Sequence, residues 1–252
     1  MSILFPFRRI MSDPFGLPLG LGTRDFVGTL AKVVCRDFSC RFRVYDDLTR
    51  IASRYRTDKG VTYYPFHGYT RHYHRFFGPL RHRPITMLEI GLARKRDRHD
   101  PRVTCPSLEL WAEYFPRATI AGFDIDDFSM VHQQRTRIFR GDQGEERDLL
   151  QVTATFPRLD IIIDDGSHAS FHQQQALKTL WPYLAPDGIY AIEDLDEQPA
   201  GLEASLPESP KTRDLLKNPS VVHRLIAGDA DIHLLGSPLR GAADTIAFII
   251  KR

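Results

Sequence analysis

The sequence predicts an α/β fold in which a mostly parallel β-sheet is covered by helices on both faces. The first observation is that strand-like and helix-like segments alternate from residue 84 onward. The second is that the strand-like segments are nearly continuous apolar runs, which is typical of parallel strands buried on both faces. The last two strands are close together in the sequence, so we expect one of them to be antiparallel.

Each element follows from its own pattern along the chain. Runs of β-branched and other apolar residues indicate strands, and apolar residues repeated every three or four positions indicate helices. The predicted strands cover residues 86–92, 119–126, 137–142, 159–165, 188–195, 231–236 and 245–251. The predicted helices cover residues 46–55, 107–115 with Ser107 as N-cap, 145–156, 170–184 and 211–226, the last one broken at Pro219.

The composition divides the chain into two predicted domains. Residues 1–83 are expected to form an N-terminal arm, rich in Gly, Pro and Phe, and a helical cap segment. Residues 84–252 are expected to form the α/β domain that contains the sheet. The apolar start of the arm leads us to expect a homodimer or a higher homo-oligomer.

The overall composition is that of a globular protein, with 42% hydrophobic and 26% charged residues. A formal net charge of +2 is too small to indicate nucleic acid as a partner. The three cysteines form no CxxC pair, which favours a reducing, cytoplasmic location. We expect neither a secretion signal nor a membrane span, because no apolar run approaches about 18 residues.

Acidic residues follow the predicted parallel strands, at the edge where ligands bind in such sheets. They are Glu89, Asp124, Asp142, the pair Asp164 and Asp165, and the pair Glu193 and Asp194. Helix capping explains one Asp per turn but not two carboxylate pairs on neighbouring strand ends. Such pairs repel each other unless a cation joins them, and oxygen ligands favour Mg²⁺, Ca²⁺ or Mn²⁺ over zinc.

The turn after the first strand indicates the type of cofactor. The run "EIGLARKR" has no G-x-G-x-x-G, which a dinucleotide requires, and the sequence contains no phosphate-binding P-loop motif. An acidic residue, one glycine and then Asp124 at the end of the next strand fit a smaller nucleoside ligand. Asp124 would accept hydrogen bonds from ribose hydroxyls. S-adenosylmethionine carries a nucleoside without phosphate and is therefore the expected cofactor.

A family resemblance appears at these motifs. The runs "TDKG", "HGYT", "LEIG", "SLELWAEYFPRATIAGFDID", "GDQ", "DIIIDDGSH" and "GIYAIEDL" resemble the macrocin/mycinamicin-type sugar O-methyltransferases over residues 50–196. The resemblance implies a Rossmann-like class I methyltransferase fold with a seven-stranded sheet, S-adenosylmethionine and Mg²⁺. It also implies methylation of a sugar or glycoside hydroxyl, on a macrolide deoxysugar, a rhamnosyl glycolipid or a methylated polysaccharide precursor.

The resemblance implies a role for each matching residue. Asp165, Glu193 and Asp194 are expected to bind Mg²⁺, and His168 is expected to act as the general base. His67 and Tyr69 are expected to contact the substrate. The residues expected to contact S-adenosylmethionine are Thr57, Lys59, Glu89, Gly91, Ser107, Asp124, Asp142, Gln143 and Asp164.

Three segments depart from the family or lie outside the resemblance. Cys105 and Pro106 stand where the family has a glycine pair before the Ser-Leu-x-x-Trp run. The basic loop 93–104 is either a solvated loop or a site that steers an anionic substrate. Residues 196–220 begin Pro-rich and acidic, and we expect a mobile loop near the acceptor site there.

Two alternatives remain open at this point. A Mg²⁺-dependent methyltransferase of a catechol or another aromatic diol would need the same metal ligands. A non-catalytic protein that binds a nucleoside would bind S-adenosylmethionine without turning it over.

Overall fold

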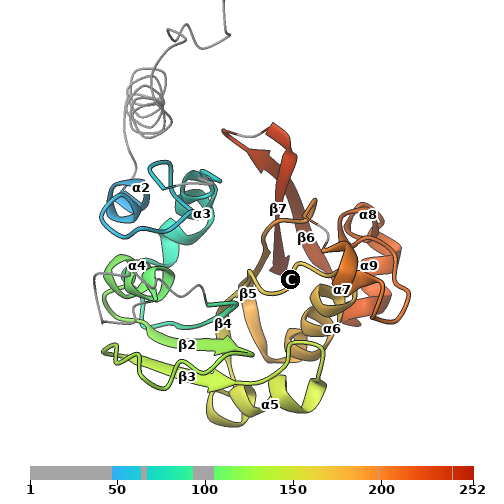
Figure 1. Ribbon diagram of the computed structural model, residues 1–252, viewed down its shortest axis with the longest axis horizontal. Helices are drawn as coiled ribbons and strands as arrows, with labels where there is room; N and C mark the ends of the chain where they lie inside the picture. Colours follow the sequence, from blue (N-terminus) through green and yellow to red (C-terminus); the bar gives the residue numbers. More distant parts are fainter. Residues whose placement is uncertain (1–46, 64–66, 93–104, 198, 240) are drawn as a thin grey trace, which may run out of the picture. The chain divides into compact units, whose positions relative to one another are not determined.

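The computed structural model describes residues 47–63, 67–92, 105–197, 199–239 and 241–252 (Figure 1). Residues 45–252 form one compact unit, distinct from residues 1–44. The predicted arm and the basic loop 93–104 lie outside the described residues. No helix in the described part of the chain is both long enough and apolar enough to cross a membrane.

The described strands form one seven-stranded sheet in the order β3-β2-β1-β4-β5-β7-β6. Strands β1 to β5 run parallel to one another, and β7 is antiparallel to both of its neighbours, β5 and β6. This arrangement confirms the predicted fold class. The strands are β1 (Thr86–Ile90), β2 (Thr119–Asp124), β3 (Thr136–Arg140), β4 (Leu159–Asp164), β5 (Leu184–Ile192), β6 (Ala230–Ser237) and β7 (Gly241–Lys251).

Helices cover both faces of this sheet (Figure 1). On one face pack α2 (Asp47–Ala52), α3 (Thr70–Phe77) and α4 (Pro106–Tyr114). On the other face pack α5 (Glu146–Thr155), α6 (Ser170–Leu180), α8 (Thr212–Leu216) and α9 (Pro219–Ile226). The remaining helical turns are α7 (Ala200–Glu203), η1 (Gly78–Leu80) and η2 (Trp181–Tyr183).

The apolar strands alternate between these two cores. Met87 packs into the core under α4, whereas its neighbours Leu88 and Ile90 pack into the core under α5 and α6. Side chains on both faces of a buried strand are apolar, which explains the continuous apolar runs in the sequence. Burial of each such side chain contributes about 1.5–3 kcal/mol before entropic losses.

An aromatic cluster attaches α3 to the sheet. The Tyr73 ring makes edge contacts with Trp111 of α4 and Phe248 of β7, at centroid distances of 5.2 and 5.5 Å. These contacts are typical of aromatic pairs in a core. They hold α3, and with it the adjoining residues 67–69, against the sheet. The predicted boundary between domains at residue 84 stays a prediction, although α2 and α3 share a core with the strands that follow.

The structure corrects three local predictions. Ser107 is not the N-cap of α4, because Pro106 already occupies the first helical turn and Cys105 precedes it. The helix predicted to end at residue 184 stops at Leu180, where Pro182 imposes a short 3₁₀ turn. The segment 196–220 contains α7 and α8, and Glu203 accepts a 2.6 Å hydrogen bond from the Ser170 amide.

Gly91 allows the ends of β1 and β4 to approach closely. Its φ is +86°, and a Cβ atom there would lie 1.9 Å from the carbonyl oxygen of Asp165. The Asp165 amide donates to the Ile90 carbonyl at 2.9 Å, so backbone contacts hold this approach in place. A side chain at position 91 would displace the turn that carries Asp165.

We expect Gly91→Ala to lower the free energy of unfolding by about 2–5 kcal/mol, the sum of a left-handed backbone penalty and an overpacking penalty. Urea unfolding of the purified variant measures this change. Gly201→Ala is the matched control, because no atom lies within 4 Å of its Cβ position. The control should change stability by less than about 1 kcal/mol. Equal stability of the two variants would contradict this account of Gly91.

Candidate active site

Five carboxylates from three strands meet at one edge of the sheet. Glu89 lies in β1, Asp164 ends β4 with Asp165 next to it, and Glu193 and Asp194 follow β5. The Glu193 amide donates to the Asp164 carbonyl at 2.9 Å, which keeps the ends of β4 and β5 together. The carboxyl ends of parallel strands share an edge, so the predicted gathering of acidic residues is present.

A buried lysine pairs with three of these carboxylates. The Lys59 side chain is 1% exposed. Its ammonium donates to the Asp165 carboxylate and, at 2.6 Å, to Oε1 of Glu193. Oε1 of Glu89 lies 3.5 Å from the same nitrogen. Lys59 comes from the segment before α3, so it links three strand ends that are distant from it in sequence.

The charged groups in this cluster shift one another's pKa values. Burial alone would lower the pKa of Lys59, but Asp165, Glu193 and Glu89 outweigh burial and raise it well above its ordinary value. Burial raises the pKa of Asp165 to about 7, repulsion from Glu193 adds to this effect, and Lys59 opposes it. Burial likewise raises the pKa values of Glu89 and Glu193, again against the lowering effect of Lys59. The group therefore contains more negative than positive charge when its carboxylates are ionised.

Asp165, His168 and Asp194 converge on one point. Each offers one oxygen or nitrogen atom, and these atoms lie within 4.8 Å of one another. The Nδ1 atom of His168 is buried and has no hydrogen-bond partner in the described part of the chain. A histidine that lies close to two carboxylates and has a buried, unpartnered ring nitrogen has the features of a site that receives a ligand.

His168 and Asp194 also adopt an uncommon backbone conformation. Their φ angles are +59° and +51°, in the left-handed region that residues other than glycine rarely occupy. Such residues are concentrated at functional sites, where the surrounding structure holds them. Here they lie at the turns after β4 and β5, and this conformation turns their side chains toward Asp165.

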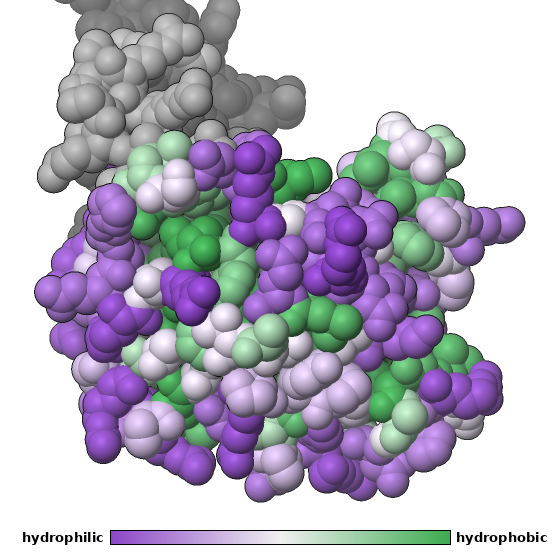
Figure 2. Space-filling view, turned by 90° about the horizontal axis from the view of Figure 1, so that it is seen from below, coloured by the Kyte–Doolittle hydropathy of each residue, from purple (hydrophilic) through white to green (hydrophobic). Residues whose placement is uncertain are grey.

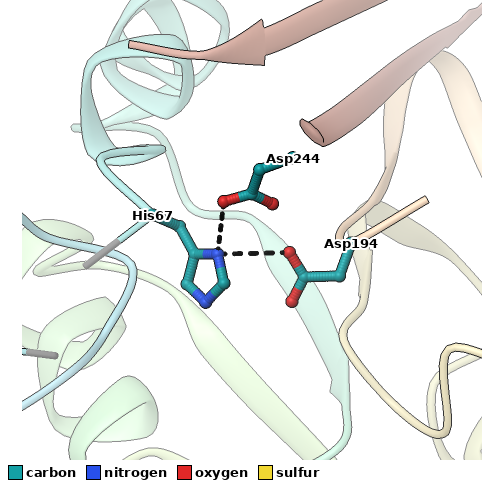
Figure 3. A group of neighbouring side chains, drawn as sticks. All are labelled: His67, Asp194 and Asp244. Carbon is teal, nitrogen blue, oxygen red and sulfur yellow. Dashed lines mark hydrogen bonds and ion pairs between the residues drawn. The ribbon is translucent and has the colours of Figure 1, made fainter. Parts of the chain in front are cut away.

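A second group of polar side chains surrounds Asp194 (Figure 3). Nδ1 of His67 lies 2.7 Å from Oδ2 of Asp244 and 3.3 Å from Oδ1 of Asp194. The Tyr69 hydroxyl lies 2.8 Å from Oδ1 of Asp194 and also contacts the Asp244 carboxylate. All four side chains are buried. His67 and Tyr69, the predicted substrate contacts, thus contact Asp194 and Asp244 directly.

The pKa shifts within this second group differ in direction from residue to residue. Burial would lower the pKa of His67, but the hydrogen bond to Asp244 and the charges of Asp194 and Asp244 raise it to about 9. Burial raises the pKa of Asp194 to about 9, with further repulsion from Asp165 and Glu193. Hydrogen bonds from its neighbours outweigh burial at Asp244 and lower its pKa to about 2. A charged His67 therefore lies against an ionised Asp244.

The predicted cofactor residues lie at the ends of β1 and β2. Glu89 is buried, and its Oε1 accepts a hydrogen bond from Nε1 of Trp111 at 3.1 Å. Its Oε2 has no partner among the described residues. The Asp124 carboxylate accepts hydrogen bonds from the amides of Leu92 and Asp126, both at 2.7 Å. Glu89 can therefore accept a further hydrogen bond from a ligand, and Asp124 is held in a fixed orientation at the next strand end.

Gln143 connects the turn after β3 to the turn after β4. Its Nε2 donates to both oxygens of Asp164, at 2.7 and 2.8 Å, and its Oε1 accepts from the Ser167 amide. Asp142 accepts a hydrogen bond from the Gly144 amide at 2.8 Å. These contacts give Asp142, Gln143 and Asp164 a structural role, and cofactor contacts of the same residues stay predictions.

The remaining predicted residues lie beside this cluster. Oγ1 of Thr57 is 3.4 Å from the Lys59 amide. Ser107, in the first turn of α4, acts to lower the pKa of the Glu89 carboxyl against the dominant effect of burial. Gly91 is required by the close approach of β4, whatever it contacts in a cofactor.

The sequence interpretation missed Asp244 and Tyr73. Asp244 precedes the apolar run of β7, and its only signal was a charged residue at the start of a buried strand. Tyr73 donates a 2.5 Å hydrogen bond to Glu193, and it lies in a stretch of mixed aromatic and His residues for which no helix was predicted. Only the fold places either residue beside the carboxylates.

The surface in the view of Figure 2 is largely hydrophilic, with hydrophobic side chains in separate small patches. Among the described residues, the large hydrophobic side chains that are exposed are Tyr63, Ile125 and Met130. Ile125 follows Asp124 directly at the end of β2. One exposed apolar side chain therefore lies next to the predicted cofactor residues.

Known proteins resemble this chain in both sequence and fold. No family model matches the chain. The mycinamicin VI 2''-O-methyltransferase of Micromonospora griseorubida is 37% identical over 149 residues, which are 59% of this chain and 36% of that protein. The demethylmacrocin O-methyltransferase of Streptomyces fradiae matches with the same identity and the same coverage of both chains. The chain thus spans little more than a third of the length of the curated relatives it matches.

Solved structures of a methyltransferase also resemble this chain. MycE methyltransferase from the mycinamycin biosynthetic pathway, in complex with Mg and SAH, has a TM-score of 0.65 and 26% identity, covering 93% of this chain and 62% of that chain. Its complex with Mg, SAH and mycinamycin VI has a TM-score of 0.58 and 29% identity, covering 82% and 53%.

The sheet order, the strand-end site and these matches define a class I methyltransferase fold. Over the matched segment, the chain is similar to the macrocin- and mycinamicin-type sugar O-methyltransferases.

Lys59→Met tests the buried charge cluster. We expect a loss of about 3–5 kcal/mol in the free energy of unfolding at pH 8 without metal, because breaking a buried ion pair leaves its partner charges uncompensated. The exposed Lys217, paired with Asp214, is the matched control, and Lys217→Met should cost less than about 1 kcal/mol.

The loss of unfolding free energy caused by Lys59→Met should become smaller as the pH falls. The Asp165 carboxyl has a pKa of about 7 in the folded protein and an ordinary value of 3.8, and removal of Lys59 raises the folded value further. The folded variant then binds protons more readily than the unfolded chain, so acid favours its folded form. Chemical unfolding between pH 8 and about pH 4 measures the difference from the parent. A difference that stays constant across this range would contradict the assignment.

Proposed function

We propose that the protein catalyses the S-adenosylmethionine- and Mg²⁺-dependent methylation of a hydroxyl group on a sugar or glycoside. The observation that carries this proposal is the convergence of Asp165, Asp194 and His168 at the ends of β4 and β5. It combines oxygen ligands for a hard cation with an imidazole that can accept a proton.

The side chains present fit a bound Mg²⁺. Asp165 and Asp194 offer carboxylate oxygens within 4.8 Å of each other, and Glu193 is joined to Asp165 through Lys59. Oxygen donors of this kind suit Mg²⁺. When bound, Mg²⁺ supplies Lewis-acid polarisation that makes an acceptor hydroxyl more acidic. The MycE structures, which contain Mg, support this assignment by homology.

The side chains also fit a nucleoside cofactor. Oε2 of Glu89 is buried and has no partner among the described residues, and the carboxylate of Asp124 is fixed by two backbone amides. We assign the cofactor to these two strand ends, with Asp124 accepting from ribose hydroxyls. When bound, S-adenosylmethionine supplies the methyl group as a sulfonium. The SAH in the MycE complexes supports a cofactor of this type.

His168 acts as the general base in this proposal. With S-adenosylmethionine bound, the acceptor oxygen would take the methyl group, the sulfonium would become a neutral thioether, and His168 would accept the hydroxyl proton, so charge and atoms would balance. The His168 imidazole lies close to Asp165 and Asp194, and its buried Nδ1 atom has no competing partner within the described part of the chain.

The named relatives favour a sugar acceptor over a catechol. Two proteins of Streptomyces olivaceus, 37% and 36% identical, are named as methyltransferases of rhamnosyl tetracenomycin-C compounds. One of Streptomyces antibioticus, 34% identical, is named for L-olivosyl-oleandolide. We assign a glycosylated natural product as the class of acceptor. A homo-oligomeric state and a cytoplasmic location stay predictions.

Metal removal tests the proposed function. Exhaustive EDTA treatment should abolish methyl transfer to a rhamnosyl or macrolide glycoside, and added Mg²⁺ should restore it, because the acceptor hydroxyl is too weak an acid without a metal. Transfer of a labelled methyl group measures the rate, with catechol as the comparison acceptor. Full activity after EDTA would exclude the metal, and a faster reaction with catechol would exclude the sugar.

His168→Ala tests the base. We expect kcat to fall by roughly 10²-fold or more, the usual range for a lost general base. SAH affinity, Mg²⁺ affinity and melting temperature should change little, and the residual rate should rise with pH as hydroxide replaces the imidazole. His223→Ala, at an exposed residue of α9, is the matched control. A variant with a lower melting temperature but unchanged kcat would show that His168 serves only to stabilise its turn.

A further inference from the structure

Asp244 holds a buried charge at the site, and no step of the proposed reaction uses it. It lies in β7, where it is 2% exposed. The residue after it, Thr245, accepts a 3.0 Å hydrogen bond from the amide of Leu195 through its carbonyl. Leu195 directly follows Asp194, so the backbone hydrogen bond keeps Asp244 and Asp194 close together.

Two contacts of Asp244 lead to Asp194, and the one through His67 is drawn in Figure 3. One oxygen of Asp244 accepts from Nδ1 of His67 at 2.7 Å, and the other contacts the Tyr69 hydroxyl. The same His67 nitrogen is 3.3 Å from Oδ1 of Asp194, and the same Tyr69 hydroxyl is 2.8 Å from it. His67 and Tyr69 are stacked at a centroid distance of 5.2 Å, so each ring packs against the other.

Burial of these polar side chains costs free energy unless their contacts hold a functional group in place. Four polar side chains at most 4% exposed take the place of apolar packing, and a partly satisfied buried network is less favourable than an apolar core. The backbone of Asp194 is in the left-handed region, so its side-chain contacts must help to hold it there. Carboxylates that bind metals are usually held by hydrogen bonds of this kind.

We propose that Asp244 is a positioning residue that, acting through His67 and Tyr69, fixes the Asp194 carboxylate in the orientation required to bind the metal ion. The proposal rests on the proposed function, because it takes Asp194 as a metal ligand. It assigns β7 a part in the site, although β7 contributes no group that touches the reacting atoms.

Calorimetric titration of the purified chain with Mg²⁺, and separately with SAH, tests this inference. Asp244→Asn should weaken Mg²⁺ binding about 10- to 100-fold, the usual effect of losing an outer-shell partner, and leave SAH affinity within about twofold. Asp231→Asn, at an exposed residue of the neighbouring strand β6 paired with Arg252, is the matched control and should bind both as the parent does.

Asp194→Ala separates the two hypotheses. If it retains the Mg²⁺ affinity of the parent, the proposed metal site is wrong and the role of Asp244 falls with it. If it loses Mg²⁺ while Asp244→Asn binds as the parent does, the metal site stands and the positioning role is refuted. A parallel loss of Mg²⁺ and SAH affinity in Asp244→Asn, with a lower melting temperature, would show a purely structural role.

Tyr69→Phe decides the matter if Asp244→Asn does not fold. This variant removes only the hydroxyl between Asp194 and Asp244, so Mg²⁺ affinity should fall several-fold at an unchanged SAH affinity. The double variant with Tyr69→Phe and Asp244→Asn should weaken Mg²⁺ binding by less than the product of the two single fold-changes, because both substitutions act through the same contacts. Unchanged Mg²⁺ affinity in Tyr69→Phe would overturn the proposal.

Discussion

The Lys59 ammonium is the charge on which the arrangement of the site depends. Three strands end with buried carboxylates at one edge of the sheet, and their mutual repulsion in a low-dielectric interior opposes the close approach of β1, β4 and β5. Lys59 contacts Glu193 and Asp165 and lies near Glu89, so one cation offsets part of three charges. The excess negative charge that remains is suited to a divalent ion, which is why charge balance and metal binding are connected here.

The segment before α3 brings both polar groups to the strand ends. Lys59 contacts the carboxylates of β1, β4 and β5, whereas His67 and Tyr69 contact Asp194 and Asp244. An apolar interaction holds this polar segment, because the rings of Tyr73, Trp111 and Phe248 fix α3 on the sheet. The orientation of the charged groups therefore depends on packing in a core that contains none of the reacting atoms.

Local patterns were sufficient to predict the parallel strands, the antiparallel end of the sheet and the carboxylates after each strand. The strand-end rule also placed Asp165, His168 and Asp194 together, because parallel strands end at one edge. The pattern could not show that Lys59 meets Asp165, since 106 positions separate them and only packing of α3 joins them. Asp244 was missed for a related reason: it lies in an antiparallel strand, to which the strand-end rule does not apply. The capping error at Ser107 was a local one, in which Pro106 took the first helical turn.

The position of β7 in the sheet has a consequence for how the site assembles during folding. β7 follows β6 in the chain but lies between β5 and β6, so β6 has no place in the sheet until β7 has paired with β5. Asp244 comes with that insertion, and with it the second half of the contacts around Asp194. A folding intermediate with strands β1 to β5 in place would have the nucleoside-binding edge but an unsupported Asp194. The polar network around Asp194 is therefore complete only once β7 has paired with β5, so the competence of the site depends on a contact between distant parts of the chain.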